Sequence, residues 1–164
     1  MAAITLILGT YALIQRYQNA QLQEEKEEQD TISVSLSTDK PAYRKLEPII
    51  INIVIKNNGS EPVGILKWHT PIEAVEMPCL NVLHRRSLGR SIEVEYLGPL
   101  KVIGSDDGVP DANDYYVVPV GESLDMSIDL LLFYDLDLPG SYDVKYNNDL
   151  TSFVSNTMQF RVHE

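Results

Sequence analysis

The sequence predicts an all-β protein, an immunoglobulin-like antiparallel β-sandwich with an N-terminal helical extension. Apolar residues between positions 31 and 164 recur at every second position, which is the period of a strand with one buried face. Turn-forming Gly, Pro and Asn residues interrupt this pattern after roughly every 8 to 12 residues, as in two-sheet folds. With 164 residues, the chain has room for one such domain. We therefore expect an extension at residues 1–30 and a β-sandwich at residues 31–164, called the head below.

The first expected strands differ in how they alternate. Ile32, Val34 and Leu36 are separated by serines, which predicts a half-buried strand. Residues 49–56 are almost all Ile and Val, which predicts a central strand covered on both faces. Residues 57–60 (NNGS) follow as a turn, because Asn and Gly tolerate positive φ.

The remaining strands are expected from shorter alternating runs. They cover residues 63–68, 80–84, 92–97, 115–118, 124–130, 142–146 and 158–162. A turn at Pro139 and Gly140 precedes Tyr142, and a core tyrosine in that place closes a loop through its hydroxyl. Since Cys79 is the sole cysteine, the disulfide of antibody domains is excluded and only the architecture is expected.

The extension has two parts. Residues 2–14 are mostly apolar and Arg16 follows them, so residues 2–17 form a candidate membrane anchor of borderline length. A signal peptide and a helix buried in a complex are the alternatives. Residues 15–30 are polar and rich in helix formers, which is typical of a solvated helical stalk. We expect an extracytoplasmic protein that is membrane-anchored or secreted.

Charge limits the class of partner. The formal net charge is −11, and the densest basic cluster is Arg85, Arg86 and Arg90. Nucleic acid is not expected as a partner, because its phosphates require a basic face. Cys79 lies in an apolar setting, where a thiol usually packs as a small hydrophobic side chain. We expect no catalytic residue.

The sharpest local motif is Trp68, His69, Thr70 and Pro71. One interpretation is a binding loop with exposed Trp and His. The favoured interpretation is structural, with Trp68 filling the core between the sheets and Pro71 ending the strand.

Residues 104–114 (GSDDGVPDAND) form an acidic loop whose carboxylates are hard oxygen ligands. Their spacing does not match a calcium-binding loop, so a solvated acidic loop is favoured over a calcium site. We expect no cofactor and no metal.

Five short segments occur in a fixed order along the head. They are residues 66–73 (LKWHTPIE), 96–99 (YLGP), 114–115 (DY), 119–123 (PVGES) and 134–142 (YDLDLPGSY). In this order and spacing the chain resembles the non-catalytic β-domain that precedes the catalytic domain in deuterolysin-type and peptidyl-Lys zinc metalloendopeptidases. The resemblance covers residues 32–162. In those proteins the domain belongs to the pro-region, where it assists folding or covers the active site.

The resemblance implies a fold and a link to metallopeptidases, but it transfers no activity. A zinc peptidase of this type needs two His one helical turn apart with a Glu beside the first. His69, His84 and His163 are isolated, so we expect a non-enzymatic domain without the peptidase part. The expected function is a protein-binding module that acts in trans, as an inhibitor of a peptidase or as a folding assistant.

Two further considerations remain open. A similar sandwich with comparable turns occurs in small bacterial inhibitors of intracellular serine proteinases, which favours the inhibitor interpretation. The alternative function is a membrane-tethered structural or adhesive domain that is unrelated to proteolysis.

Overall fold

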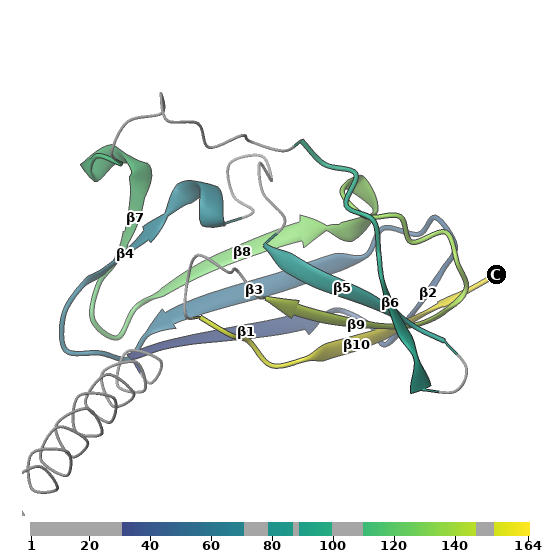
Figure 1. Ribbon diagram of the computed structural model, residues 1–164. Coiled ribbons are helices and arrows are strands. Elements are labelled where there is room, and N and C mark those ends of the chain that lie inside the picture. The colour runs from purple at the N-terminus through teal and green to yellow at the C-terminus, as the bar shows by residue number, and fades with distance from the viewer. Residues whose placement is uncertain (1–30, 71–78, 87–88, 100–109, 147–152) are drawn as a thin grey trace, which may run out of the picture.

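The strands of the head belong to three sheets. The computed structural model describes residues 31–70, 79–86, 89–99, 110–146 and 153–164 (Figure 1). The first sheet has the order β1–β3–β8, formed by β1 (Ile32–Thr38), β3 (Ile50–Asn57) and β8 (Ser123–Asp129). The second has the order β2–β10–β9–β5–β6, formed by β2 (Ala42–Arg44), β10 (Met158–His163), β9 (Gly140–Tyr146), β5 (Leu80–Arg85) and β6 (Ser91–Glu93).

A two-stranded ribbon is the third sheet, formed by β4 (Val63–Leu66) and β7 (Tyr115–Val118). Short 3₁₀-helices of one turn occur in the described connections, among them η1 (Lys67–His69), η3 (Ala112–Asp114) and η4 (Leu130–Leu132). Among the described strands, every pair is antiparallel except β2 with β10. The all-β prediction is therefore confirmed, and the immunoglobulin-like class stays a prediction.

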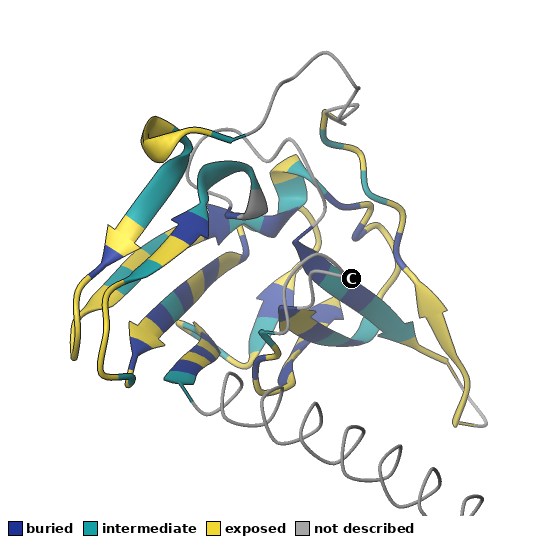
Figure 2. Cartoon of the chain, turned by 60° about the vertical axis from the view of Figure 1, so that its left-hand side comes forward, coloured by how far each residue is buried: buried dark blue, intermediate teal, exposed yellow. Residues whose placement is uncertain are grey.

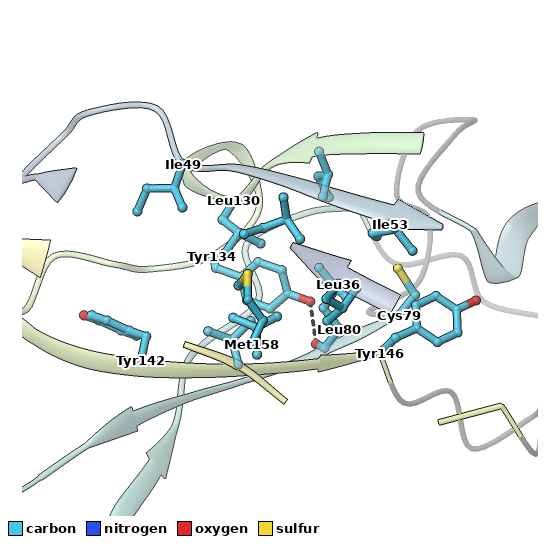
Figure 3. Packing of buried hydrophobic residues seen from close by; sticks show 14 of the residues in the cluster. Leu36, Ile49, Ile53, Cys79, Leu80, Leu130, Tyr134, Tyr142, Tyr146 and Met158 are labelled. Atoms are coloured by element: carbon cyan, nitrogen blue, oxygen red, sulfur yellow. Dashed lines mark hydrogen bonds between the residues drawn. The ribbon is translucent and has the colours of Figure 1, made fainter. Parts of the chain in front are cut away.

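The buried faces of the three-stranded and five-stranded sheets contribute to one hydrophobic core. Figure 3 shows Ile49 and Ile53 on one side and Tyr142, Leu80 and Tyr146 on the other. Along β1 and β10 buried and exposed residues alternate strictly, visible as stripes in Figure 2. In these two strands the period-2 pattern predicted correctly which side chains enter the core.

Strand β3 is central in its sheet, as predicted, but the expectation that both its faces are covered was wrong. Ile51, Ile53 and Ile55 are buried, whereas Ile50 and Asn52 on the opposite face are exposed. The physical reason is that β-branched residues favour strands on either face, so a run of Ile and Val does not report two buried faces.

The predicted role of Tyr142 is confirmed. Its hydroxyl donates a hydrogen bond to the carbonyl of Leu138, four residues upstream, and so closes the turn that leads into β9. Its ring stacks on Phe160, with ring centroids 5.2 Å apart. The hydroxyl and the ring therefore anchor the start of β9 to the neighbouring strand β10.

The expected anchor and stalk at residues 1–30 lie outside the described residues. Within the part of the chain that the structure describes, no helix is long and apolar enough to cross a membrane.

One cysteine thiol and several tyrosine hydroxyls lie in the hydrophobic core or against it. Burial raises the pKa of the Cys79 thiol from 9.0 to about 12, and burial likewise raises the pKa of Tyr96 to about 12. Burial also raises the pKa values of Tyr134 and Tyr146. Burial thus favours the neutral forms of these groups, because a partly or fully apolar environment solvates their anions poorly.

We expect the free energy of unfolding to fall as the pH rises above about 9. The folded pKa of Cys79 is raised above its unfolded value of 9.0, so its stabilising contribution is complete below pH 9 and is lost as the pH rises towards about 12. Urea titrations at pH 8, 9.5 and 11 measure this effect. A disulfide exchange reagent at pH 8 should leave Cys79 unmodified until urea unfolds the protein. Rapid modification of the folded protein would contradict the burial of this thiol.

Candidate functional site

Trp68, His69 and Thr70 of the candidate binding motif follow strand β4 at the end of the β4–β7 ribbon. Figure 1 shows this ribbon apart from β5, β9 and β10 of the five-stranded sheet. In its register Gly64 faces Val117 and Leu66 faces Tyr115. The ring of Tyr115 lies against Gly64, where a Cβ atom would be 3.1 Å from the Cδ1 atom of the ring. The missing side chain of Gly64 thus lets the tyrosine ring pack on the ribbon.

Thr70 has a structural role. Its Oγ1 donates a hydrogen bond of 2.7 Å to the carbonyl oxygen of Lys67, and its backbone N–H donates one of 3.0 Å to the same atom. Thr70 is also buried. Its polar groups therefore end the 3₁₀-helix η1, which supports the structural interpretation for this residue.

Trp68 does not fill the core between the sheets, so that expectation was wrong. Strand β4 ends at Leu66, and Trp68 lies half-buried in η1 outside the set of buried core residues. The prediction assumed that the strand continues through Trp68. The chain instead changes from extended to 3₁₀ conformation at Lys67, so the alternation of buried and exposed side chains along β4 does not apply to Trp68. The side chain of His69 and all of Pro71 lie outside the described residues, so the structure does not test their expected roles.

The ribbon presents apolar and aromatic side chains to solvent. Val117 is 65% exposed and Val120, just beyond β7, is 48% exposed. The Nζ of Lys67 lies 5.3 Å from the ring centroid of Tyr116, a distance typical of a cation–π contact. The sequence analysis did not single out Val117. The apolar run YYVV at residues 115–118 does not alternate with polar residues, so it gives no signal for which of its side chains is exposed.

Each strand of the ribbon pairs only with the other among the described residues. The outer edge of β4 therefore carries backbone N–H and C=O groups outside any described ladder. Such edges accept an added strand from another chain.

The described part of the acidic loop serves local folding. Asp111 and Asp114 form a capping box on η3, in which the Asp111 carboxylate accepts from the N–H of Asn113 and the Asp114 carboxylate from the N–H of Asp111. Asp106 and Asp107 lie outside the described residues. Across residues 31–70, 79–86, 89–99, 110–146 and 153–164, no three His, Cys, Asp or Glu side chains gather as metal ligands.

Two of the five sequence segments meet in space. Tyr96 forms a bridge with Tyr134, and their ring centroids are 5.3 Å apart. The backbone N–H of Leu97 donates to the carbonyl of Phe133 at 2.7 Å, and the hydroxyl of Tyr134 donates to the carbonyl of Leu80 at 2.7 Å, drawn as a dashed line in Figure 3. These contacts therefore hold together the connections beside β5.

No protein-family model matches this chain. Over 100 residues it is 26% identical to an extracellular protease of Aeromonas hydrophila, and the match covers 61% of this chain. The same match covers 26% of that relative, so the chain spans about a quarter of its length. This distant, partial similarity fits a protease-associated domain.

Two solved structures give weaker likenesses. An alkylpurine DNA glycosylase of Pseudomonas fluorescens has a TM-score of 0.43 at 8% identity, over 82% of this chain and 31% of its own. A β-glucosidase of Listeria innocua has a TM-score of 0.43 at 12% identity, over 80% of this chain and 16% of its own. Likenesses at this level carry no argument about the function of this chain.

Proposed function

We propose that this chain is a non-catalytic protein-binding module of a protease-related system, built as an immunoglobulin-like sandwich. It binds a metallopeptidase in trans, as an inhibitor or as a folding assistant. The observation that carries this proposal is the similarity to part of an extracellular protease. The segments shared with the pro-region domains of deuterolysin-type peptidases support the same partner.

The β4–β7 ribbon is the contact surface in this proposal. The outer edge of β4, which forms no ladder with another described strand, offers backbone hydrogen bonds to an extended segment of the partner. Val117 and Trp68 add apolar and aromatic surface, the composition that protein interfaces favour at their centres. Burial of these side chains against a peptidase would remove an exposed apolar surface from water.

The module acts by binding and not by chemistry. Cys79, the sole thiol, is buried, and its raised pKa keeps it protonated at neutral pH. A buried neutral thiol is a poor nucleophile. The name of the relative, an extracellular protease, also favours an extracytoplasmic location for this chain. The alternative function is a membrane-tethered structural or adhesive domain that has no peptidase partner.

The test is capture of a peptidase by the immobilised full chain from envelope and secreted fractions of the source organism. We expect a zinc metallopeptidase to be recovered and its activity to fall when the chain is added. Peptidase recovered without loss of activity would assign the folding-assistant role. Recovery of envelope components without a peptidase would overturn the proposal in favour of the structural domain.

A matched pair of variants locates the contact. Val117→Asp places a charge on the ribbon, whereas Val154→Asp places one at a valine that is 53% exposed and lies outside the ribbon. We expect Val117→Asp to abolish capture and Val154→Asp to preserve it. Equal loss in both variants would exclude the ribbon as the contact surface.

A further inference from the structure

The arginines of this acidic protein are gathered on one sheet. All five arginines in the described part of the chain lie on the five-stranded sheet or in the connection from β5 to β6. They are Arg44 in β2, Arg85 in β5, Arg86 and Arg90 in the connection, and Arg161 in β10. The whole chain has a net charge of −11, so the concentration of positively charged arginines on this sheet contrasts with the negative charge of the molecule as a whole.

Strand register places two of these arginines on either side of a small residue. Arg161 is opposite Ser141 of β9, and Ser141 is opposite Arg85 of β5. Neighbouring strands are about 4.8 Å apart, so the Cα atoms of the two arginines are separated by roughly 10 Å. Because the alternate residues of β10 are buried and Arg161 is exposed, this row lies on the outer face of the sheet.

A surface hollow of about 580 Å³ lies over this row. Its lining includes Arg85, Ser141, Asp143, Gln159, Arg161 and His163. The Nε of Arg85 donates a hydrogen bond of 2.6 Å to Oδ2 of Asp143, which orients both side chains. Arg161 forms no ion pair with any described residue, and Oδ1 of Asp143 is buried without a hydrogen-bond partner among them.

We propose that this hollow binds an acidic, extended segment of the partner protein. Carboxylates of the segment pair with Arg161 and with the terminal N–H groups of Arg85, whose Nε is already bonded to Asp143. Arginine suits this role because its planar guanidinium binds a carboxylate through two parallel hydrogen bonds. The inference rests on the proposed function in that the ligand is a protein, but it concerns a surface separate from the ribbon.

The observations favour a peptide over a polyphosphate such as a nucleic acid. The Asp143 carboxylate is bonded to Arg85 and offsets its charge, so the hollow lacks the dense positive charge that the closely spaced phosphates of a nucleic acid require. The net charge of −11 also repels a long polyanion, whereas a short acidic segment interacts mainly with the local arginines. Carboxylates on alternate residues of an extended peptide are about 7 Å apart, within reach of two arginines roughly 10 Å apart.

The test measures binding of the full chain to a synthetic heptapeptide with glutamate at alternate positions, by calorimetry at low ionic strength. The control peptide carries glutamine at those positions. We expect the glutamate peptide to bind, its affinity to fall with added salt, and the glutamine peptide to bind at least about tenfold more weakly.

Matched variants assign the site. Arg161→Gln removes one positive charge from the hollow, and Lys56→Gln removes one from the exposed outer face of β3. We expect Arg161→Gln to weaken peptide binding by about tenfold and Lys56→Gln to change it by less than about twofold. Equal effects of the two variants, or binding of inorganic phosphate or a DNA oligonucleotide as tightly as the peptide, would overturn the inference.

The two proposals fail in different ways. Peptide binding that is lost in Arg161→Gln supports the inference even where capture of a peptidase fails, and only the peptidase proposal is then overturned. Capture of a peptidase that depends on Val117, without any binding of the acidic peptide, overturns the acidic-segment inference and leaves the peptidase proposal standing.

Discussion

Replacing Ile53 by alanine is expected to lower the free energy of unfolding by about 4 kcal/mol. Ile53 is fully buried in the middle of β3, opposite Leu36 of β1 and Met126 of β8. The substitution removes three carbon atoms from the core and leaves a cavity, because strands held on both sides collapse only partly into the space. Urea unfolding followed by circular dichroism measures the change.

Ile50→Ala is the matched control, since Ile50 lies on the opposite face of the same strand and is 36% exposed. We expect this substitution to cost less than about 1 kcal/mol. A similar cost for both variants would contradict the assignment of one buried and one exposed face to β3.

Replacing Asn57 by leucine is expected to lower the free energy of unfolding by about 3 kcal/mol. Asn57 is fully buried at the end of β3. Its Nδ2 donates to the carbonyls of Glu61 at 2.7 Å and Val118 at 3.0 Å, and its Oδ1 accepts from the N–H of Gly59 at 2.9 Å. Leucine has a similar volume but no hydrogen-bond donor or acceptor in its side chain. The buried carbonyl of Val118 therefore loses its hydrogen bond.

The loss of Asn57 should also loosen the ribbon, because Val118 is the last residue of β7 and this side chain links it to β3. We expect the amides of β7 to exchange hydrogen faster in Asn57→Leu than in the unsubstituted protein. Asn58→Ala is the control, since Asn58 is exposed and its side chain donates one exposed hydrogen bond to Ser33. An equal loss of stability in Asn58→Ala would show that turn propensity, and not the buried hydrogen bonds, is responsible.

Asn57 also shows where interpretation of the sequence was incomplete. Residues 57–60 were assigned to a turn because Asn and Gly tolerate positive φ. The turn is present, but Asn57 has a second role that joins β3, the turn and the ribbon through one buried amide. Nothing local distinguishes a buried turn asparagine from an exposed one, since its partner Val118 lies 61 positions away.

The candidate binding motif was predicted less well than the strands. Trp68 was placed in the core by extending the alternation of β4, but the chain turns into η1 at Lys67. Thr70, two residues on, ends that turn through its hydroxyl. Short 3₁₀ turns depend on a few local hydrogen bonds, and the apolar period does not report them.

Local periodicity by itself determined the all-β class and the face of β1 and β10 that is buried. The turn at Pro139 and Gly140 indicated the hydroxyl contact of Tyr142. These features depend on residues close together in the chain, where the period of the strand decides the direction of each side chain. Only the tertiary structure decided that β4 pairs with β7 and with no other described strand, and that Arg85 and Arg161 flank Ser141. Strand order and register join residues far apart in sequence, and they are set by how the strands share one core.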